Sequence, residues 1–516
     1  MFMKFRPLIR TLSDRQLICL FTLFSFLFAG WIMLQRHDRI NTDAVLYLEM
    51  AKRFAAADYH GALDLYNWPL FPWLMAITHT ITGLSVQHAA YLLQTIFFSI
   101  TTWGFLTLIR EGGGNRRTII TAAVLLFSAP YIVGYVLSMI MRDQGFWAFH
   151  VLSLLFFFRF WQRQKFTDAL LWQIAAILAI LFRVEAVSFI VLLPLCLMMR
   201  KDLPIKQRFA LLASSYALLL FGSICAIILM LSAPASLAHS LGRLPEIHTS
   251  LLASYHQLSI GLAAKAKIYG ELVLGNYLAE YAISGLIATF LIVIVGKVAG
   301  ATSWLATGLA CLPYTGEHKP GPDIRTVLFW AAGINILNLA VILLTVFTIS
   351  GRYAISLSFI ILFFAAFKLA GMTEEWTLSS VKKLSVRDKF IGIVVAVFTT
   401  YWLIANVIQH DRSNSYEQRA VSWVKKHAPA DAAIFYDEAR LRYYADAPWD
   451  GRGTDWAQIS GPTSKPYDYL VLHISHKDAK LKLAQVAQMK QYRQVQEFKA
   501  KNGDRIWILT TANRHP

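Results

Sequence analysis

Long apolar segments alternate with short polar segments over most of the chain. An apolar run of about 18 to 22 residues is what a helix needs to cross a membrane, where no water satisfies exposed backbone groups. This template predicts about eleven membrane-spanning helices. They are placed near residues 17–34, 86–108, 118–136, 146–160, 168–182, 185–199, 208–231, 278–296, 326–348, 354–371 and 389–407.

Lysine and arginine gather in alternate loops between these segments, as cytoplasmic loops require. With the N-terminus inside, an odd number of spans places the C-terminus outside the membrane. An alternative joins the fifth and sixth spans into one kinked segment at "LFRVEAV", which would reverse the later loops, but the basic loops argue against it. These basic loops lie near 110–117, 159–165, 200–208, 319–325 and 382–389.

The N-terminal charges and the overall composition also indicate a membrane protein with several spans. The first apolar run follows four basic residues but lacks a small-residue cleavage site, so we expect an uncleaved span. The 516 residues are 56% hydrophobic and only 16% charged, which excludes an ordinary soluble domain. The net charge of +18 falls in loops, so it does not indicate a nucleic-acid partner. The four cysteines lack CxxC spacing and support neither disulfides nor a thiolate zinc site.

Three long segments are predicted on the outer side: 35–87, 234–278 and 410–516. The last has a soluble pattern, with helical periodicity at 416–428 and 480–492 and strands at 432–437, 467–475 and 505–511. The predicted fold class is therefore a mainly α, polytopic membrane protein with a small C-terminal α/β domain outside the cytoplasm. We expect residues 1–409 to form the membrane domain, with surface helices in loop 35–87, and residues 410–516 to form the soluble domain.

The first outer segment contains a carboxylate, Asp43, shortly after the first span. From Thr42 onward the pattern predicts a short amphipathic helix along the outer surface, with Val45 and Leu48 on its apolar side. Thr42 or Asp43 would then be the N-cap of this helix. Alternatively, Asp43 is a general base, because a carboxylate beside a low-dielectric surface can accept a proton near neutral pH. Downstream, two prolines begin a second short apolar helix that ends at Gly83.

Several short motifs occur in a fixed order along the chain. Asp43, Tyr47 and Ala51 at four-residue steps precede a Trp-Pro-Leu-Phe-Pro block and a Gly-Leu-Ser turn. "MIMRDQGFWAF", "LFRVEAVSFIVLLPL", "SGRYAISLSFIILFF" and "YEQRAVSWVKKHAPADAAIFYDEARLRYYAD" follow. In this order and on these predicted sides, the motifs resemble those of the GT-C membrane glycosyltransferases. That superfamily includes protein O-mannosyltransferases and the aminoarabinose and Rgt-type bacterial transferases.

The resemblance implies an inverting hexosyl- or pentosyltransferase in a bacterial inner membrane. It would move a sugar from a polyprenyl-phosphate-linked donor to a lipid, glycan or protein acceptor on the outer face. A phosphate leaving group needs little acid catalysis, so the chemistry requires a base for the acceptor hydroxyl and cations for the phosphate. The implied catalytic base is Asp43. The other implied site residues are Asp143 and Glu185 as second acidic positions, Arg142, Arg183 and Arg352 for the donor phosphate, and Tyr47, Tyr66, Trp68 and Tyr353 in the substrate pocket.

Other interpretations of the same residues stay open. Arg142 and Arg352 are also suited to anchoring helix ends at the interface, Asp143 to capping a helix, and Arg183 and Glu185 to neutralising each other. No cofactor is indicated, and a divalent cation is left open, because many relatives have a carboxylate pair where this chain has Asp38 five residues before Asp43. A transporter or flippase of a lipid-linked saccharide and a non-catalytic envelope scaffold are the alternative functions.

Overall fold

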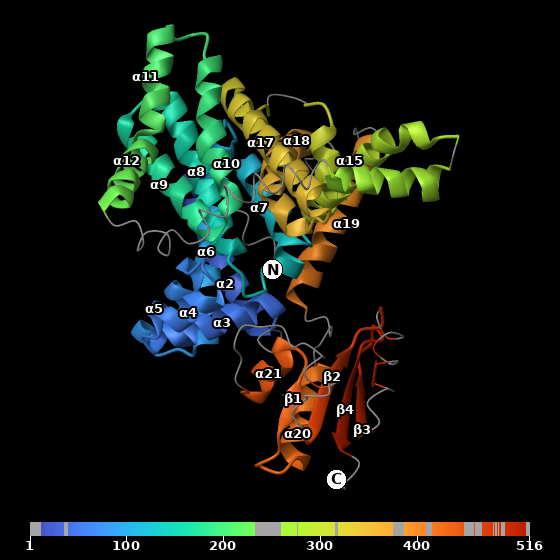
Figure 1. Cartoon of the computed structure of the whole chain (residues 1–516). Helices are drawn as coiled ribbons and strands as arrows, with labels where there is room; N and C mark the ends of the chain where they lie inside the picture. Colours follow the sequence, from blue (N-terminus) through green and yellow to red (C-terminus); the bar gives the residue numbers. More distant parts are fainter. Residues whose placement is uncertain are drawn as a thin grey trace. The chain divides into compact units, whose positions relative to one another are not determined.

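The structure is a computed structural model (Figure 1). It describes residues 12–35, 40–232, 260–275, 277–314, 318–374, 386–408, 415–447, 459, 467–477, 479, 482, 485–486 and 491–511. The chain divides into two compact units. Unit 1 comprises Met1–Met33, Tyr91–Ser138 and Arg142–Ile408, and unit 2 comprises Leu34–Ala90, Met139–Met141 and Gln409–Pro516.

Unit 1 is built from apolar helices. Six described helices are long and apolar enough to cross a membrane: Asp14–Gln35, Val86–Glu111, Ala279–Thr302, Pro322–Val346, Gly351–Thr373 and Lys389–Val407. A seventh span results if Ile205–Ser215 and Ala217–Cys225, bent by 49°, are taken together. The prediction of a mainly helical, polytopic membrane protein is thus confirmed, whereas the count of about eleven spans stays a prediction.

The helices and helical turns from which unit 1 is formed are α2 (Asp14–Gln35), α6 (Val86–Glu111), α7 (Arg116–Phe127), η1 (Ile132–Val136), α8 (Asp143–Arg163), α9 (Phe166–Phe182), η2 (Val184–Ala186), α10 (Val187–Leu192), η3 (Leu193–Met199), α11 (Ile205–Ser215), α12 (Ala217–Ser232), η4 (Gly270–Leu274), η5 (Ala279–Tyr281), α15 (Ala282–Thr302), α16 (Trp304–Cys311), α17 (Pro322–Val346), η6 (Gly351–Ala354), α18 (Ile355–Glu374) and α19 (Val386–Val407).

The third predicted span is not a continuous helix, and the fifth and sixth are two helices. The span at 118–136 is interrupted, because α7 ends at Phe127 and only the π-helical turn η1 follows. Pro130 lies in this break, where it lacks an N–H and disfavours a helical conformation of the residue before it. The fifth and sixth spans are separate helices rather than one kinked helix, since Arg183 is extended and α10 packs back against α9.

Four of the predicted basic loops, near 110–117, 159–165, 200–208 and 319–325, lie together in unit 1, and residues 382–385 of the fifth lie outside the described residues. The Gly321 N–H donates to the Gly112 carbonyl at 3.0 Å, joining the loops after α6 and before α17. Gln207 Nε2 donates to Gln164 Oε1 at 2.6 Å, which joins the first turn of α11 to the residue that ends α8. Loops that the sequence predicts on one side of the membrane therefore lie together in unit 1. That this side is the cytoplasm stays a prediction.

The first part of unit 2 consists of three short helices, α3 (Thr42–Ala55), α4 (Tyr59–Leu65) and α5 (Leu70–Thr82). α3 buries Val45, Leu48 and Ala51, as its amphipathic pattern predicts, and packs against α4 and α5. α5 begins after Pro69 and ends at Gly83, whose φ of 71° is readily adopted by glycine. Both predicted surface helices of the first outer segment are thus present, together with a third, α4.

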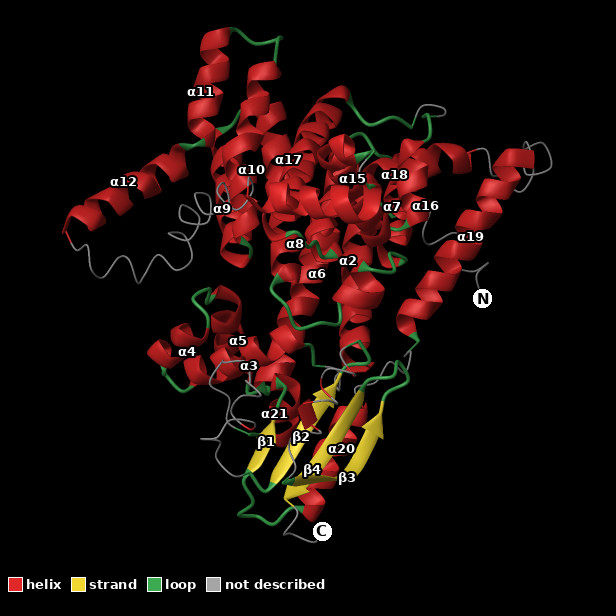
Figure 2. Cartoon of the chain, turned by 45° about the vertical axis from the view of Figure 1, so that its right-hand side comes forward, coloured by secondary structure: helices red, strands yellow, loops and turns green. Residues whose placement is uncertain are grey.

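The C-terminal part of unit 2 is a four-stranded sheet with a helix against one face (Figure 2). Its elements are α20 (Ser415–His427), β1 (Ile434–Tyr436), α21 (Ala439–Ala445), β2 (Tyr469–Ile474), β3 (Tyr492–Lys499) and β4 (Arg505–Thr511). The strand order is β1-β2-β4-β3, with β1 parallel to β2 and the other pairs antiparallel. The predicted strands at 432–437, 467–475 and 505–511 are confirmed.

Side chains alternate between the two faces of this sheet, as the strand period requires. On β2, Tyr469 and Val471 join the apolar cluster with α20, while Leu470 and Leu472 belong to the cluster on the opposite face. The sequence did not predict β3, because its polar side chains lack this alternation at the edge of the sheet. Most of the predicted helix at 480–492 lies outside the described residues; residues 482, 485 and 486 are helical, whereas the last residue, Tyr492, begins β3.

Within unit 2, the first outer segment packs against α21 of the C-terminal part. The Tyr443 hydroxyl donates to Gln87 Oε1 at 2.8 Å, and Lys52 Nζ lies 5.5 Å from the centroid of the Tyr443 ring. The Ile40 N–H donates to the Tyr444 hydroxyl at 3.4 Å. The sequence indicated two separate outer segments, whereas the structure makes them one compact body.

A cluster of buried and half-buried ionisable side chains lies where α20 meets β2. Arg440 Nη2 lies 2.9 Å from Glu417 Oε1 and 3.2 Å from Glu438 Oε2, and His473 Nδ1 lies 2.8 Å from Glu438 Oε1. Burial raises the pKa of Glu417 and of Asp437 to about 7 in each case. Burial lowers the pKa of His473, but the hydrogen bond and charge of Glu438 outweigh it, so the net pKa is raised. Burial alone would raise the pKa of Glu438, but His473 and Arg440 outweigh it and lower this pKa to about 2.

These shifts predict that the C-terminal sheet is most stable at mildly acidic pH. Glu417 and Asp437 keep protons that the unfolded chain has released, and the raised pKa of His473 acts in the same direction, so stability falls as pH rises from about 5 to 8. Below about pH 4.5 stability falls again, because Glu438 has a lowered pKa. Hydrogen–deuterium exchange of β2 in the full chain, corrected for intrinsic rates, measures this. Glu417→Gln should flatten the fall above pH 5, and equal protection at pH 5 and 8 in the unchanged chain would contradict the assignment.

Candidate active site

Unit 1 brings together five of the residues that the sequence singled out. Arg183 donates from Nη1 to Asp143 Oδ1, and its Nη2 lies 3.2 Å from Glu185 Oε1. Asp143 is the first residue of α8, and Arg183 follows the last residue of α9 in an extended conformation. Both side chains are buried, with Asp143 3% and Arg183 7% exposed. The interpretation that Arg183 and Glu185 neutralise each other is therefore confirmed as a contact, and Asp143 shares in it.

The turn η6 completes this group. Arg352 Nη1 lies 3.9 Å from Asp143 Oδ2, and the guanidinium carbon of Arg183 lies 4.5 Å from the centroid of the Tyr353 ring. We call Asp143, Arg183, Glu185, Arg352 and Tyr353 the Arg183 cluster. The start of α8, the junction between α9 and η2, and the distant turn η6 meet in it.

The members of the Arg183 cluster are engaged to different degrees. Two carboxylates face two guanidinium groups, so the buried charges compensate each other, as removal from water requires. Arg183 is fixed by both acids and by the face of an aromatic ring. Arg352 is 29% exposed, and its Nη1 lies beyond hydrogen-bond distance of Asp143 Oδ2. Arg142 precedes α8, is half-buried, and acts electrostatically on Glu185. Because Arg142 is the N-cap of α8, Asp143 is not, and its capping interpretation is wrong.

Close packing around two glycines positions the cluster. A Cβ on Gly145 would overlap the ring of Phe182, so only glycine lets α9 approach α8 one residue before Arg183. A Cβ on Gly351 would lie 2.9 Å from Cζ of Tyr131, which lies in the break of the third predicted span. Sequence reasoning missed Tyr131 and both glycines. The available signals were the proline before Tyr131 and the direct succession of Gly351 and Arg352.

A polar contact from α17 holds the turn that carries Glu185. Asn338 Nδ2 donates to Ser188 Oγ at 2.7 Å and to the Glu185 carbonyl at 3.3 Å, and Ser188 Oγ donates to the same carbonyl at 3.0 Å. An asparagine inside an apolar span is costly unless its amide is satisfied. Asn338 is thus a positioning residue that the sequence analysis also missed.

In unit 2, Asp43 occupies the first turn of α3. Asn41, not Thr42 or Asp43, is the N-cap, so the capping interpretation of Asp43 is wrong. The Asn41 side chain instead accepts from the Ile140 N–H at 3.1 Å and donates to the Ile140 carbonyl at 3.3 Å. Asp43 is half-buried, and the helix N-terminus stabilises a negative charge there.

The predicted aromatic residues of the first outer segment also lie in unit 2. The Tyr47 ring centroid is 6.5 Å from that of Tyr66 and 5.7 Å from that of Phe71. Trp68 is 5% exposed, and its indole N–H has no hydrogen-bond partner among the described residues. Buried indole N–H groups usually find a partner, so Trp68 is the member of this group whose polar atom is unsatisfied.

The described part of the chain contains no group of three or more His, Cys, Asp or Glu side chains arranged to hold a metal ion. Asp38, the nearest acidic residue before Asp43, lies outside the described residues. A role for a divalent cation is therefore untested.

The close contact at Gly145 predicts a specific sensitivity. Gly145→Ala should push Phe182 and Arg183 away from α8 and destabilise unit 1 by about 1 to 3 kcal/mol through overpacking. The matched control is Gly296→Ala in α15, where an added Cβ meets no described atom within 4 Å and alanine favours the helix. Melting temperatures of both variants in detergent measure the effect. An unchanged or raised melting temperature for Gly145→Ala would show that α8 and α9 are not in this contact.

Comparisons with known proteins bear on the identity of this arrangement. The family model described as dolichyl-phosphate-mannose-protein mannosyltransferase matches residues 67–226. Among solved structures, the chain is similar to ArnT from Cupriavidus metallidurans bound to undecaprenyl phosphate, at 13% identity and a TM-score of 0.41, over 98% of this chain and 100% of that chain. It is similar to the same ArnT in the apo state at 14% identity and a TM-score of 0.43, over 97% and 99% of the two chains.

A third similar structure is the arabinofuranosyltransferase AftD from Mycobacteria, at 14% identity and a TM-score of 0.47, over 98% of this chain and 40% of that chain. No curated protein matches the sequence. The family match covers α5 to the beginning of α12 and so includes Arg142, Asp143, Arg183 and Glu185. Over residues 67–226, this match supports the resemblance to GT-C membrane glycosyltransferases that was drawn from the order of the motifs.

Proposed function

We propose that the protein is an inverting glycosyltransferase that moves a sugar from a polyprenyl-phosphate-linked donor to a lipid, glycan or protein acceptor on the outer face of a bacterial inner membrane. The family description over residues 67–226 names a dolichyl-phosphate-linked sugar, which belongs to this donor class.

The Arg183 cluster is the observation that carries the proposal. A donor phosphate needs a cation at the membrane boundary, and a guanidinium suits this role because it stays charged and forms paired hydrogen bonds with phosphate oxygens. Arg183 is already bound by two carboxylates, so we assign it the role of positioning Asp143 and η6. Arg352, partly exposed and 3.9 Å from Asp143, is the arginine that would bind the donor phosphate. Arg142 supplies a second positive charge beside Glu185.

Asp43 would act as the general base. Its carboxylate removes the proton of the acceptor hydroxyl, and the acceptor oxygen attacks the anomeric carbon from the side opposite the phosphate. The bond between the anomeric carbon and the phosphate oxygen breaks, and its electron pair leaves with the polyprenyl phosphate. Arg352 stabilises the negative charge that develops on this phosphate. A single displacement of this kind inverts the anomeric centre.

The distribution of basic loops supports an outer-face reaction. With the loops at 110–117, 159–165 and 200–208 inside, the chain alternation places the N-terminal end of α8 and the turn at Arg183 outside. The same alternation assigns position 43, just after the first span, to the outer side. The soluble sheet at the C-terminus would also be outside the cytoplasm.

The proposal predicts that Asp43→Asn abolishes sugar transfer without loss of membrane insertion. The measurement compares masses of envelope lipids, glycans and glycoproteins from a deletion strain that expresses either the unchanged chain or the variant. The unchanged chain should restore a mass increment of one sugar, and Asp43→Asn should not, because an amide cannot accept the proton.

Asp64→Asn is the matched control, since Asp64 is an exposed aspartate on α4 in the same outer segment. It should restore the increment fully. Full restoration by Asp43→Asn would remove Asp43 from the mechanism. If the chain moved the intact donor across the membrane of reconstituted vesicles without consuming it, the protein would be a transporter and not a transferase.

A further inference from the structure

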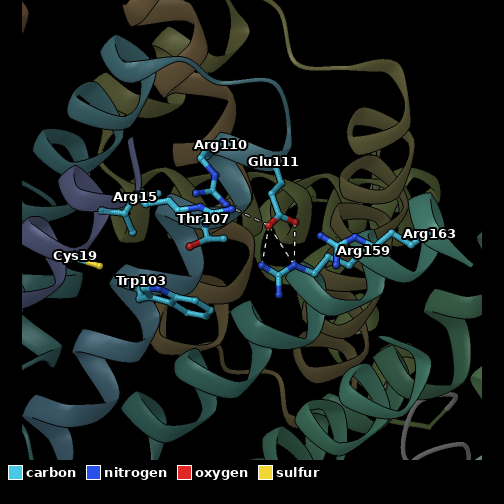
Figure 3. A pocket seen from close by; sticks show the side chains of 9 residues that line it. Arg15, Cys19, Trp103, Thr107, Arg110, Glu111, Arg159 and Arg163 are labelled. Atoms are coloured by element: carbon cyan, nitrogen blue, oxygen red, sulfur yellow. Dashed lines mark hydrogen bonds and ion pairs between the residues drawn. The ribbon is translucent and has the colours of Figure 1, made fainter. Parts of the chain in front are cut away.

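Unit 1 contains a cavity at the end opposite the Arg183 cluster. The cavity has a volume of about 370 Å³ and lies between the beginning of α2 and the ends of α6 and α8 (Figure 3). It is lined by Arg15, Ile18, Cys19, Trp103, Thr107, Arg110, Glu111, Arg159 and Arg163. We call it the arginine cavity. Its volume is in the range of small-molecule sites.

The arginine cavity carries an excess of positive charge. Four arginines line it against one carboxylate, Glu111, so four charges minus one leave a net of three. Glu111 is committed to Arg159, whose Nη2 and Nε lie 2.7 and 3.0 Å from its oxygens. Arg110 Nη2 lies 3.6 Å from Glu111, beyond hydrogen-bond distance.

The other two arginines are held even less. Arg163 approaches Asp168 only to 4.0 Å and is 50% exposed. Arg15 forms no ion pair with any residue that the structure describes. Three guanidinium groups of the cavity are thus available to an anion, and the fork of donors on each suits phosphate oxygens.

The position of the cavity indicates which membrane leaflet it meets. Asp143 begins α8 and Arg159 lies 16 residues later, which corresponds to about 24 Å along the helix. This separation approaches the thickness of the hydrocarbon layer, about 30 Å. The Arg183 cluster and the arginine cavity therefore lie at opposite boundaries of the membrane. The cavity is at the end that carries the basic loops, which the sequence predicts to be cytoplasmic.

Apolar surface continues from the cavity along α2. Leu20, Leu23 and Leu27 follow Cys19 on successive turns and are 46%, 58% and 62% exposed. A ligand with a charged head in the cavity could extend hydrocarbon chains along this stripe. A soluble anion would make no use of it, so the surroundings favour an amphiphile.

We propose that the arginine cavity binds the phosphodiester headgroup of an anionic membrane lipid from the leaflet on the basic side. Arg15, Arg110 and Arg163 bind the phosphate, Arg159 is fixed beside them by Glu111, and the acyl chains lie against α2. This site is separate from the proposed transfer reaction and does not depend on it. Basic pockets between membrane helices on the cytoplasmic side bind such headgroups in general.

The first test uses the unchanged full chain and the accessibility of Cys19. Both Cys19, in the cavity wall, and Cys311, outside it, are exposed and free. In nanodiscs, replacing phosphatidylcholine with phosphatidylglycerol should slow maleimide alkylation of Cys19 several-fold and leave Cys311 unchanged. Equal alkylation of Cys19 in both lipids would overturn the proposal. Slowing by inorganic phosphate in phosphatidylcholine nanodiscs would show a site for soluble phosphate instead of a lipid.

The second test removes charge from the cavity. Native mass spectrometry in detergent should show phosphatidylglycerol bound to the unchanged chain, and Arg110→Gln with Arg163→Gln should weaken this binding at least about tenfold. Lys206→Gln, an exposed charge on α11 outside the cavity, is the control and should leave binding unchanged. If Lys206→Gln weakened binding as much as the double variant, general surface charge and not the cavity would explain the effect. Undiminished binding by the double variant would exclude the arginines as the site.

Discussion

The buried contact of Arg183 with Asp143 and Glu185 is the constraint on which the proposed site depends. The buried carboxylate of Asp143 at the start of α8 is stable away from water only while the Arg183 guanidinium stays beside it, and the half-buried Glu185 in η2 binds the same guanidinium. This requirement fixes the break between α9 and η2 and brings Arg352 and Tyr353 beside the same charges. A buried ion pair adds little net stability, so its effect is better described as fixing one arrangement of helix ends.

The two ends of α8 differ in the balance of charged side chains around them. At one end, acids and arginines compensate each other, and Arg352, to which we assign the donor phosphate, is partly exposed. At the other, arginines exceed acids and surround a cavity. The first arrangement suits a reaction in which charge appears on a leaving phosphate, because the compensating acids hold the cations in place beforehand. The second suits a permanently charged lipid headgroup, which needs an uncompensated positive field.

The sequence predicted the features that follow from local pattern. Apolar runs predicted the helices, the prolines and Gly83 bounded α5, and alternation predicted β1, β2 and β4. The pairing of Arg183 with Glu185 was open to sequence reasoning because only one residue, Val184, lies between them. Asp143, 40 residues away, joined this pair only in the structure. Contacts that depend on packing, such as Gly145 against Phe182 and Asn338 against Ser188, leave no local signal. The edge strand β3 was missed because an exposed strand need not alternate.

Melting temperatures of Arg183→Met, Asp143→Asn and the double variant in detergent test the central claim most directly. Arg183→Met alone leaves the buried Asp143 carboxylate without its closest cation and should destabilise unit 1 strongly, by about 3 to 5 kcal/mol. The added Asp143→Asn removes one of those charges, so the double variant should melt at a higher temperature than Arg183→Met alone. If the two substitutions instead lower the melting temperature additively, the residues do not interact, and Arg183 does not hold the site together.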